Sequence, residues 1–238
     1  MKLIIDIGNT AVKIALFEGD ELISSTTLDE CTLQNILIFV ANHTISNTII
    51  SSVKALNTDI EKIIKHFDAL FLNENTPLPI KIDYKTPITL GRDRIAAVVG
   101  ASVLFPKQDV LVIDAGTCLT IDFINKEKVY KGGRISPGIM MRYSALHQFT
   151  NKLPLCEFSE RSMLMGQDTE SSIISGVQQG ILAEVREIIN VYKKENKKTI
   201  ITVTGGGCFF FEKELKNSIF ANPFLVMEGL NEILDYNE

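Results

Sequence analysis

The sequence predicts an α/β protein built from two copies of one kind of domain, with a central cleft between the copies. The first observation is the predicted order of strands and helices, β-β-β-α-β-α-β, which runs through the first half of the 238-residue chain and restarts in the second half. The second is that each half opens on an apolar strand that ends on an aspartate, Asp6 or Asp114, two residues before a glycine. We therefore predict domains at residues 1–106 and 107–238, each with a mixed five-stranded sheet. Chance similarity of two short hairpins is the alternative.

The first half alternates short apolar strands with helices of 3.6-residue period. Apolar runs on either side of a tight turn at Gly8 predict a hairpin, and the mostly apolar run 48–53 is typical of a strand buried in a parallel sheet. A run that is apolar nearly all round, at 95–105, predicts a helix buried between two layers. The predicted strands are 2–7, 11–17, 22–26, 48–53, 69–72 and 80–84, and the predicted helices lie at 28–43, 59–67 and 95–105.

The second half repeats this order with a longer helix in the middle. An apolar stripe at helical spacing predicts one long helix over 169–194. A β-branched strand at 199–204 runs into three consecutive glycines. The other predicted strands are 109–114, 119–124, 129–133 and 224–227, and the other predicted helices are 138–148, 209–216 and 229–234.

The composition is that of a globular protein. Hydrophobic residues make up 45% and charged residues 22% of the chain, and the net charge of −5 does not support non-specific binding to nucleic acid. The four cysteines are widely spaced and the three histidines do not cluster with them, so we expect reduced thiols rather than a zinc site or disulfides. With no leader before Leu3 and no membrane-spanning apolar run, we expect a cytoplasmic protein that does not associate with membranes.

Two aspartates at equivalent strand ends would face each other across the predicted cleft. Carboxylates that converge without partners raise one another's pKa, whereas cations and a polyphosphate between them make the arrangement favourable. Phosphoryl transfer requires such an arrangement, because its transition state is stabilised mainly by positioning and by cations. The pair Asp6 and Asp114 therefore predicts a metal-dependent site for phosphoryl transfer. Capping of each turn by its own aspartate is the alternative.

Two glycine-containing segments have the chemistry of a nucleotide site. The turn after Asp6 offers small residues, backbone amides and hydroxyls to an anion, and Lys13 stands near the start of the next strand. We predict that this hairpin holds phosphates; an ordinary hairpin is the alternative. The three glycines after strand 199–204 would let a flat ligand lie on the backbone, although a flexible strand–helix joint has the same sequence. Neither a P-loop nor the dinucleotide-binding glycine fingerprint is present in the sequence.

Asp93 lies between two arginines at the start of the apolar helix 95–105. An acid in a first helical turn ordinarily stabilises the helix dipole. A carboxylate fixed in a cleft can also accept a proton from an alcohol that attacks phosphorus. Arg92 or Arg94 can bind a substrate carboxylate through two parallel hydrogen bonds. Because buried charge needs a reason, a role of Asp93 as such a proton acceptor stands beside its role at the helix dipole.

Several motifs in a fixed order extend over nearly the whole chain. They lie at 6–10 (DIGNT), 84–87, 91–94 (GRDR), 114–117 (DAGT), 120–122 (TID), 132–138 (GGRISPG), 153–154, 166–169 and 204–206. With these motifs the chain resembles the type III pantothenate kinases, a family of the acetate and sugar kinase, heat-shock chaperone and actin superfamily. The resemblance implies two duplicated ribonuclease H-like domains, which are also called actin-like ATPase domains.

The resemblance also implies an activity, the transfer of the ATP γ-phosphoryl group to the primary hydroxyl of pantothenate in the first committed step of coenzyme A synthesis. The ATP-binding residues that it implies are Asp6, Ile7, Gly8, Asn9, Thr10, Ala11, Val12, Lys13, Thr117, Gly205 and Gly206. The implied pantothenate-binding residues are Tyr84, Gly91, Arg92, Asp93, Arg94 and Thr169, with Asp93 as the general base.

The cofactors and partners that the resemblance implies are two cations and a second copy of the chain. Mg²⁺ would lie near Asp6, and Asp114 would hold a monovalent cation, K⁺ or NH₄⁺. The small-molecule partners would be ATP and pantothenate. The family's dimers imply a homodimer in which the second subunit completes the substrate pocket.

The chain departs from the family pattern around Thr169 and after Thr117. Asp168 stands where an asparagine is usual, and serines follow the threonine where the family has Ala-Ile, so we expect altered local hydrogen bonding around a retained substrate residue. Cys118 stands where alanine is common, and we expect a buried thiol that behaves as a small hydrophobe. We expect His147, on a predicted helix face, to be structural.

Two other functions fit parts of the sequence. One is a non-catalytic regulator that has kept a nucleotide cleft, against which the intact Asp6, Asp93 and Asp114 argue. The other is a kinase of the same superfamily for another small alcohol. Tyr84 and the two arginines beside Asp93 favour an acidic substrate such as pantothenate over that alternative.

Overall fold

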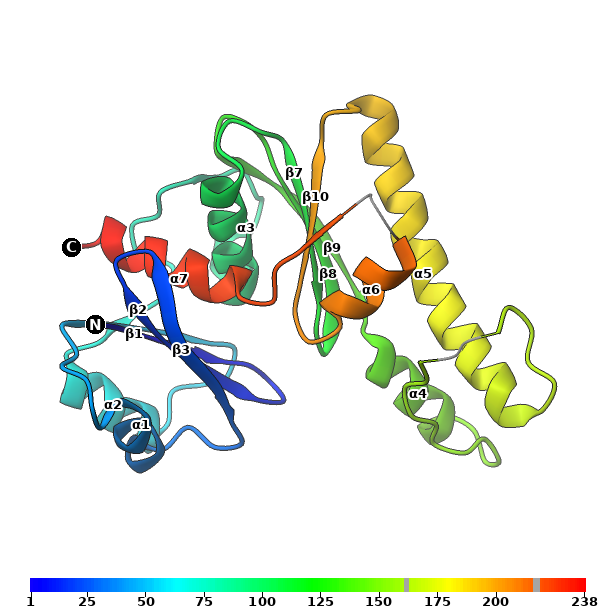
Figure 1. Cartoon of the computed structure of the whole chain (residues 1–238), viewed down its shortest axis with the longest axis horizontal. Coiled ribbons are helices and arrows are strands. Elements are labelled where there is room, and N and C mark those ends of the chain that lie inside the picture. The colour runs from blue at the N-terminus through cyan, green and yellow to red at the C-terminus, as the bar shows by residue number, and fades with distance from the viewer. Residues whose placement is uncertain (161–162, 216–218) are drawn as a thin grey trace. The chain divides into compact units, whose positions relative to one another are not determined.

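The computed structural model describes residues 1–160, 163–215 and 219–238, and it is an α/β protein with two mixed sheets (Figure 1). The elements of the first half are β1 (Lys2–Ile7), β2 (Val12–Glu18), β3 (Glu21–Leu28), α1 (Leu33–Val40), β4 (Asn47–Ser52), α2 (Thr58–Phe67), β5 (Leu70–Phe71), β6 (Lys81–Ile82), the 3₁₀ turn η1 (Pro87–Thr89) and α3 (Arg92–Leu104). The elements of the second half are β7 (Val110–Ala115), β8 (Cys118–Ile124), β9 (Val129–Pro137), α4 (Ile139–Gln148), α5 (Thr169–Glu195), β10 (Ile200–Thr204), α6 (Cys208–Leu215), β11 (Phe220–Ala221) and α7 (Leu225–Tyr236).

The two sheets share one strand order, which confirms the predicted duplication. The five-stranded sheet has the order β3-β2-β1-β4-β5, and five strands of the second sheet have the corresponding order β9-β8-β7-β10-β11. In the first sheet β1, β2 and β3 form an antiparallel meander, and the short links between β7, β8 and β9 indicate the same arrangement in the second. In both sheets the fourth strand pairs in parallel with the first. The prediction of five strands was wrong for the second sheet, since β6 pairs with β9 as a sixth strand.

The predicted strand at 224–227 was wrong. Phe224 is the N-cap of α7, and the next three residues form the first turn of this helix. The run 224–227 is four consecutive apolar residues, and a run of this length does not distinguish a buried helix from a buried strand by its period. The actual last strand is β11, whose two residues pair in parallel with β10. The predicted helix 209–216 matches α6, with residue 216 outside the described residues.

By internal contacts the chain divides into two compact units. Unit 1 contains Met1–Lys107, Ile124–Gly132 and Phe224–Glu238, and unit 2 contains Gln108–Phe123 and Gly133–Pro223. The domain boundary at residue 106 stays a prediction about which segments fold independently.

In unit 1 the central sheet is apolar on both faces. Leu3, Ile5 and Ile7 of β1 form a core cluster with residues of α1 and α2. Because side chains alternate along a strand, Ile4 and Asp6 lie on the opposite face, on the side of the β1–β4 pair that α3 and α7 contact. The start of α3, which carries Asp93, is thereby brought to the face of the sheet that carries Asp6.

In unit 2 the same alternation places the second aspartate. Ile113 of β7 and Val203 of β10 belong to a core cluster with residues of α5 and α6. Asp114 and Thr204, one position further along these strands, therefore lie on the face opposite to that cluster. The register of the two parallel strands makes Asp114 and Thr204 direct neighbours.

Candidate active site

The first predicted phosphate-binding segment is a tight hairpin, as the sequence predicts. Asp6 pairs with Lys13 across β1 and β2, and the Gly8 amide donates to the Ala11 carbonyl oxygen at 3.0 Å. A Cβ atom at Gly8 would lie 3.1 Å from that oxygen, so the tight turn favours glycine. Asn9 and Thr10 at its tip are exposed. The turn can therefore offer side chains and amides to an anion.

Asp6 is a carboxylate in an unfavourable place for a charge. The pKa of Asp6 is raised to about 6, mainly by burial and also by the charge of Asp93, with the Ser51 hydroxyl and the charge of Lys13 acting in the opposite direction. Within the described residues, Asp6 Oδ1 is buried without a hydrogen-bond partner. A cation beside this oxygen would remove the cost of its charge.

Asp93 lies in the first turn of α3 and folds back on that turn. Its Oδ1 accepts a hydrogen bond of 2.8 Å from the Arg94 amide, which is the helix-capping role that we considered as the alternative. A Cβ atom at Gly91 would lie 2.4 Å from the same oxygen, so glycine makes room for the carboxylate. Asp93 also lies near enough to Asp6 for its charge to raise the pKa of that acid. Capping and a part in the site are therefore compatible.

Arg94 and Tyr84 are brought together by Tyr130, which the sequence reasoning missed. The Arg94 guanidinium is buried and donates to Tyr130 Oη at 3.0 Å. The rings of Tyr84 and Tyr130 are 5.8 Å apart, and the Tyr84 ring covers Gly132. The available signal was the buried arginine itself, because a guanidinium inside a protein needs acceptors.

Arg92 points to a different set of partners. Its Nη2 donates to Glu74 Oε2 at 3.3 Å and to the Ile88 carbonyl oxygen at 3.4 Å. The guanidinium is thus tied to the loop before β6 and to the turn η1. An incoming carboxylate would have to replace or share the Glu74 contact.

Asp114 faces the three consecutive glycines at 205–207. The structure gives a steric reason for glycine at the first of these positions. Gly205 has a φ of +83°, and a Cβ atom there would lie 2.3 Å from Asp114 Oδ1. The Gly207 amide donates to the Ala115 carbonyl oxygen at 2.9 Å. Around Gly206, in contrast, a Cβ atom would meet no atom within 4 Å. The run therefore combines close packing against β7 with an open backbone surface.

Thr117 lies in a turn that packs on the start of α4. Gly138 donates its amide hydrogen to the Thr117 carbonyl oxygen at 3.1 Å, and a Cβ atom at Gly138 would lie 2.4 Å from the Gly116 carbonyl oxygen. Cys118 is half-buried, so the expectation of a fully buried thiol was wrong. The next β8 residue, Leu119, is the first of this strand in the core.

Thr169 is the first residue of α5, and the unusual residues around it build the helix cap. The Asp168 carboxylate accepts from the Ser171 amide at 2.8 Å, and Ser171 Oγ accepts from the Asp168 amide at 3.1 Å. These hydrogen bonds lower the pKa of Asp168. The departure from the family pattern therefore forms a capping box that leaves the Thr169 side chain exposed.

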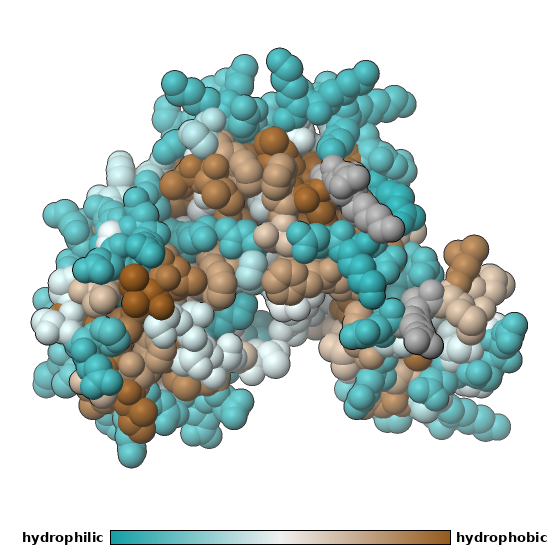
Figure 2. Space-filling model, in the orientation of Figure 1, coloured by the Kyte–Doolittle hydropathy of each residue, from teal (hydrophilic) through white to brown (hydrophobic). Residues whose placement is uncertain are grey.

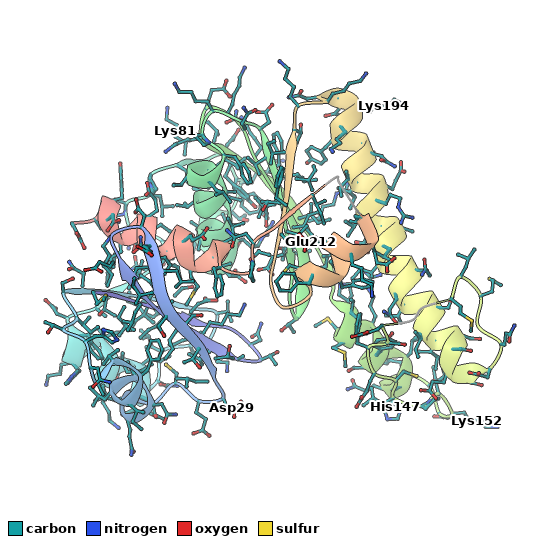
Figure 3. All side chains as sticks on the ribbon, viewed as in Figure 1. Asp29, Lys81, His147, Lys152, Lys194 and Glu212 are labelled. Atoms are coloured by element: carbon teal, nitrogen blue, oxygen red, sulfur yellow. The ribbon has the colours of Figure 1, made fainter. Side chains whose placement is uncertain are left out.

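His147 has the structural role that we expected. Its Nδ1 lies 2.8 Å from the Leu153 carbonyl oxygen, which links the end of α4 to the following loop. Figure 3 shows His147 and Lys152 near each other in this part of unit 2.

The oxygen donors present suit hard cations bound together with a ligand. In the described part of the chain, no group of three or more His, Cys, Asp and Glu side chains could hold a metal ion alone. Asp6 offers an unpartnered carboxylate oxygen, which suits a Mg²⁺ ion that keeps phosphate and water ligands. Asp114 has the backbone of residues 115 and 205 close by, where carboxylate and carbonyl oxygens suit a monovalent cation.

The predicted residues thus form two groups, one in each unit. Unit 1 holds Asp6, Lys13, Tyr84, Arg92, Asp93 and Arg94. Unit 2 holds Asp114, Thr117, Thr169, Gly205 and Gly206. Among the described residues no helix has the length and apolar character needed to cross a membrane.

Comparison with known proteins identifies the family. The family model described as type III pantothenate kinase matches residues 2–191. The chain belongs to the type III pantothenate kinase family. A type III pantothenate kinase from Cytophaga hutchinsonii is 44% identical and one from Bacteroides fragilis is 43% identical, with 100% of this chain covered in both and 100% and 98% of the relatives.

Solved structures with a similar fold, sugar kinases among them, agree with a duplicated actin-like ATPase fold for this chain. A Baf family protein from Campylobacter jejuni has a TM-score of 0.65 at 23% identity and covers 99% of this chain and 98% of its own. A glucokinase from an Antarctic psychrotroph has a TM-score of 0.51 at 10% identity, covering 99% and 98%. At these identities the similarity concerns the fold alone.

Proposed function

We propose that this protein transfers the γ-phosphoryl group of ATP to the primary hydroxyl of pantothenate, which is the first step of coenzyme A synthesis in the cytoplasm. The observation that carries the proposal is the juxtaposition of Asp6 and Asp93 in unit 1, within a chain of the type III pantothenate kinase family. Two nearby carboxylates of which one is buried are suited to a reaction that needs both a cation ligand and a proton acceptor.

Asp93 is the proposed general base. Its carboxylate would accept the proton of the pantothenate hydroxyl as the oxygen attacks the γ-phosphorus and the bond to the β-phosphate oxygen breaks. The position next to Asp6 keeps this proton acceptor beside the phosphates. Tyr84, Gly91, Arg92, Arg94 and Thr169 are the proposed pantothenate residues.

The proposed nucleotide residues lie in three backbone turns. The hairpin residues Asp6, Ile7, Gly8, Asn9, Thr10, Ala11, Val12 and Lys13 would bind the phosphates. Thr117 would also contact ATP, and Gly205 and Gly206 would lie along the adenosine, where the open backbone at Gly206 supports the proposal.

Asp6 would hold Mg²⁺ and Asp114 would hold K⁺ or NH₄⁺. When bound, these cations would neutralise negative charge on the phosphates. Without a cation, the buried Asp6 carboxylate would carry its charge at a cost, and the raised pKa of Asp6 supports this need for a cation.

We also propose that the protein is a homodimer in which unit 2 supplies the interface. Between residues 135 and 165 unit 2 exposes many large apolar side chains, which is unusual for an isolated soluble chain: Ile135, Met140, Met141, Phe149, Leu155, Phe158, Met163, Leu164 and Met165. Figure 2 shows apolar residues, in brown, among the hydrophilic residues of the visible face.

A coupled assay of ADP release tests the activity. The protein with ATP, Mg²⁺ and K⁺ should form ADP only when pantothenate is added. Replacing K⁺ by Na⁺ should lower the rate, and an Asp114→Ala variant should lose this dependence. No pantothenate-dependent ADP would contradict the activity, and equal rates in the two salts would contradict the cation assignment alone.

A further inference from the structure

Ser51 presents a buried hydroxyl to the Asp6 carboxylate. Ser51 of β4 is the direct register partner of Asp6 on β1, so the two side chains lie on the same face of the sheet. Ser51 is 0% exposed. Among the described residues neither Ser51 Oγ nor Asp6 Oδ1 makes a hydrogen bond of good geometry, although the hydroxyl lies close enough to the carboxylate to lower the pKa of Asp6. A buried hydroxyl without a partner lowers the stability of a fold, so its presence here needs an explanation.

The second sheet repeats this arrangement independently. Thr204 of β10 is the register partner of Asp114 on β7. Thr204 is also 0% exposed, and within the described part of the chain its Oγ1 has no hydrogen-bond partner. A hydroxyl residue therefore stands at the same topological position beside each of the two strand-end aspartates.

The next residue along β4 shows what a structural serine looks like in this segment. Ser52 Oγ donates to the Lys54 carbonyl oxygen at 2.9 Å and accepts from the Lys54 amide at 3.0 Å. These two hydrogen bonds hold the turn after β4. Ser51 makes no comparable contribution, although it is more deeply buried.

We propose that Ser51 is a positioning residue of the nucleotide site, whose hydroxyl donates to the Asp6 carboxylate when the nucleotide and its cation bind and fixes the orientation of that carboxylate. The inference rests on the proposed function. The unpartnered hydroxyl is a cost in the free protein that ligand binding removes. The repetition at Thr204 argues that this cost is a property of the site and not an accident of one strand.

Ser51→Ala and Ser52→Ala variants of the full chain give opposite expectations. Ser51→Ala removes an unsatisfied hydroxyl, so the melting temperature of the free protein should stay the same or rise. Mg-ATP should raise the melting temperature of Ser51→Ala by less than it raises that of wild type. The dissociation constant of Mg-ATP, measured by calorimetry, should increase roughly tenfold, as for a lost hydrogen bond to a charged group. Ser52→Ala should melt lower than wild type when free and keep the full rise with Mg-ATP.

A Ser51→Cys variant, similar in volume but weak as a donor, covers the case in which alanine disturbs packing. It should show the same loss of Mg-ATP affinity as Ser51→Ala. The inference is overturned if the folded alanine or cysteine variant binds Mg-ATP as wild type does. It is overturned together with the proposed function if wild type neither binds Mg-ATP nor forms pantothenate-dependent ADP. If wild type does both, the inference is supported by a loss of Mg-ATP affinity that occurs in the Ser51 variants and not in Ser52→Ala.

Discussion

Asp6 has a pKa of about 6, raised by burial and by the nearby Asp93 charge. The folded protein therefore holds a proton on Asp6 more tightly than the unfolded chain, whose aspartate has a pKa of 3.8. By linkage, this aspartate stabilises the fold below about pH 4, and the contribution is lost as the pH rises through about 6.

We expect an Asp6→Asn variant, measured without divalent cations, not to show this loss of stability as the pH rises. The difference in free energy of unfolding between variant and wild type should shift in favour of the variant as the pH rises from about 4 to about 6.5, and then stay constant. Urea unfolding of both proteins at several pH values measures it. A constant difference over the whole range would contradict the raised pKa of Asp6.

For Asp93, we expect the Asp93→Asn variant to keep the fold and to lose about 10² to 10⁴ in turnover, since this is the usual contribution of a general base. Asp59→Asn is the matched control, because Asp59 is an acid in the first turn of α2 with a side chain that is 48% exposed. Turnover with pantothenate and the melting temperature are the measurements. Near-normal turnover in Asp93→Asn would remove this residue from the base role.

At this scale the sequence predicts residues whose chemistry is local. Asp6, Asp93 and Asp114 each follow from a short motif beside a turn or a helix start. Ser51 and Tyr130 do not, because their importance depends on strand register and on a partner 36 residues away in sequence, Arg94. No local pattern in one sequence reports such pairings.

At the scale of elements, α3 and α7 cross at two glycines. A Cβ atom at Gly229 would lie 1.8 Å from the Ala96 carbonyl oxygen, and one at Gly100 would lie 2.3 Å from the Leu225 carbonyl oxygen. The two helix backbones are therefore in direct contact, which only residues without a side chain allow. The same helices also contact the sheet of unit 1, α7 on β1 and both on β4.

We expect Gly229→Ala to destabilise the protein by about 2 kcal/mol or more, because overpacking against backbone cannot relax through side-chain movement. Gly180→Ala is the matched control, since Gly180 is an exposed glycine of α5 with nothing within 4 Å of a Cβ atom. This change should stabilise α5 by about 0.5–1 kcal/mol. Chemical denaturation measures both, and equal effects of the two changes would contradict the close crossing.

Elements with a clear period or turn signal could be predicted from the sequence, and the others could not. The β1–β2 hairpin and α5 lie within a few residues of their predicted bounds. The start of α7 was mistaken for a strand because the run 224–227 is wholly apolar and too short for its period to distinguish a helix from a strand. β6 pairs with β9, a segment far away in the sequence, and no pattern within either segment predicts this pairing.

For the whole molecule, the prediction concerns association. Sedimentation over a range of concentrations should give a dimer, and Met165→Glu should shift it towards the monomer, because a charge in an apolar interface is costly. Met165 is 78% exposed in the single chain. Ile38→Glu, at a residue of α1 in unit 1 that is 68% exposed, is the control and should leave the dimer intact. A monomer at all concentrations would contradict the proposed dimer.

The membership of α7 in unit 1 has a consequence for synthesis on the ribosome. The residues of unit 2 are translated before Phe224–Glu238, which complete unit 1. Until α7 has left the exit tunnel, β1 and β4 lack one of the helices that cover them, and α3 lacks the helix that crosses it. Synthesis of unit 2 is therefore complete before synthesis of unit 1. The N-terminal strands of unit 1 keep apolar surface exposed for the longest time, and chaperones bind such surface.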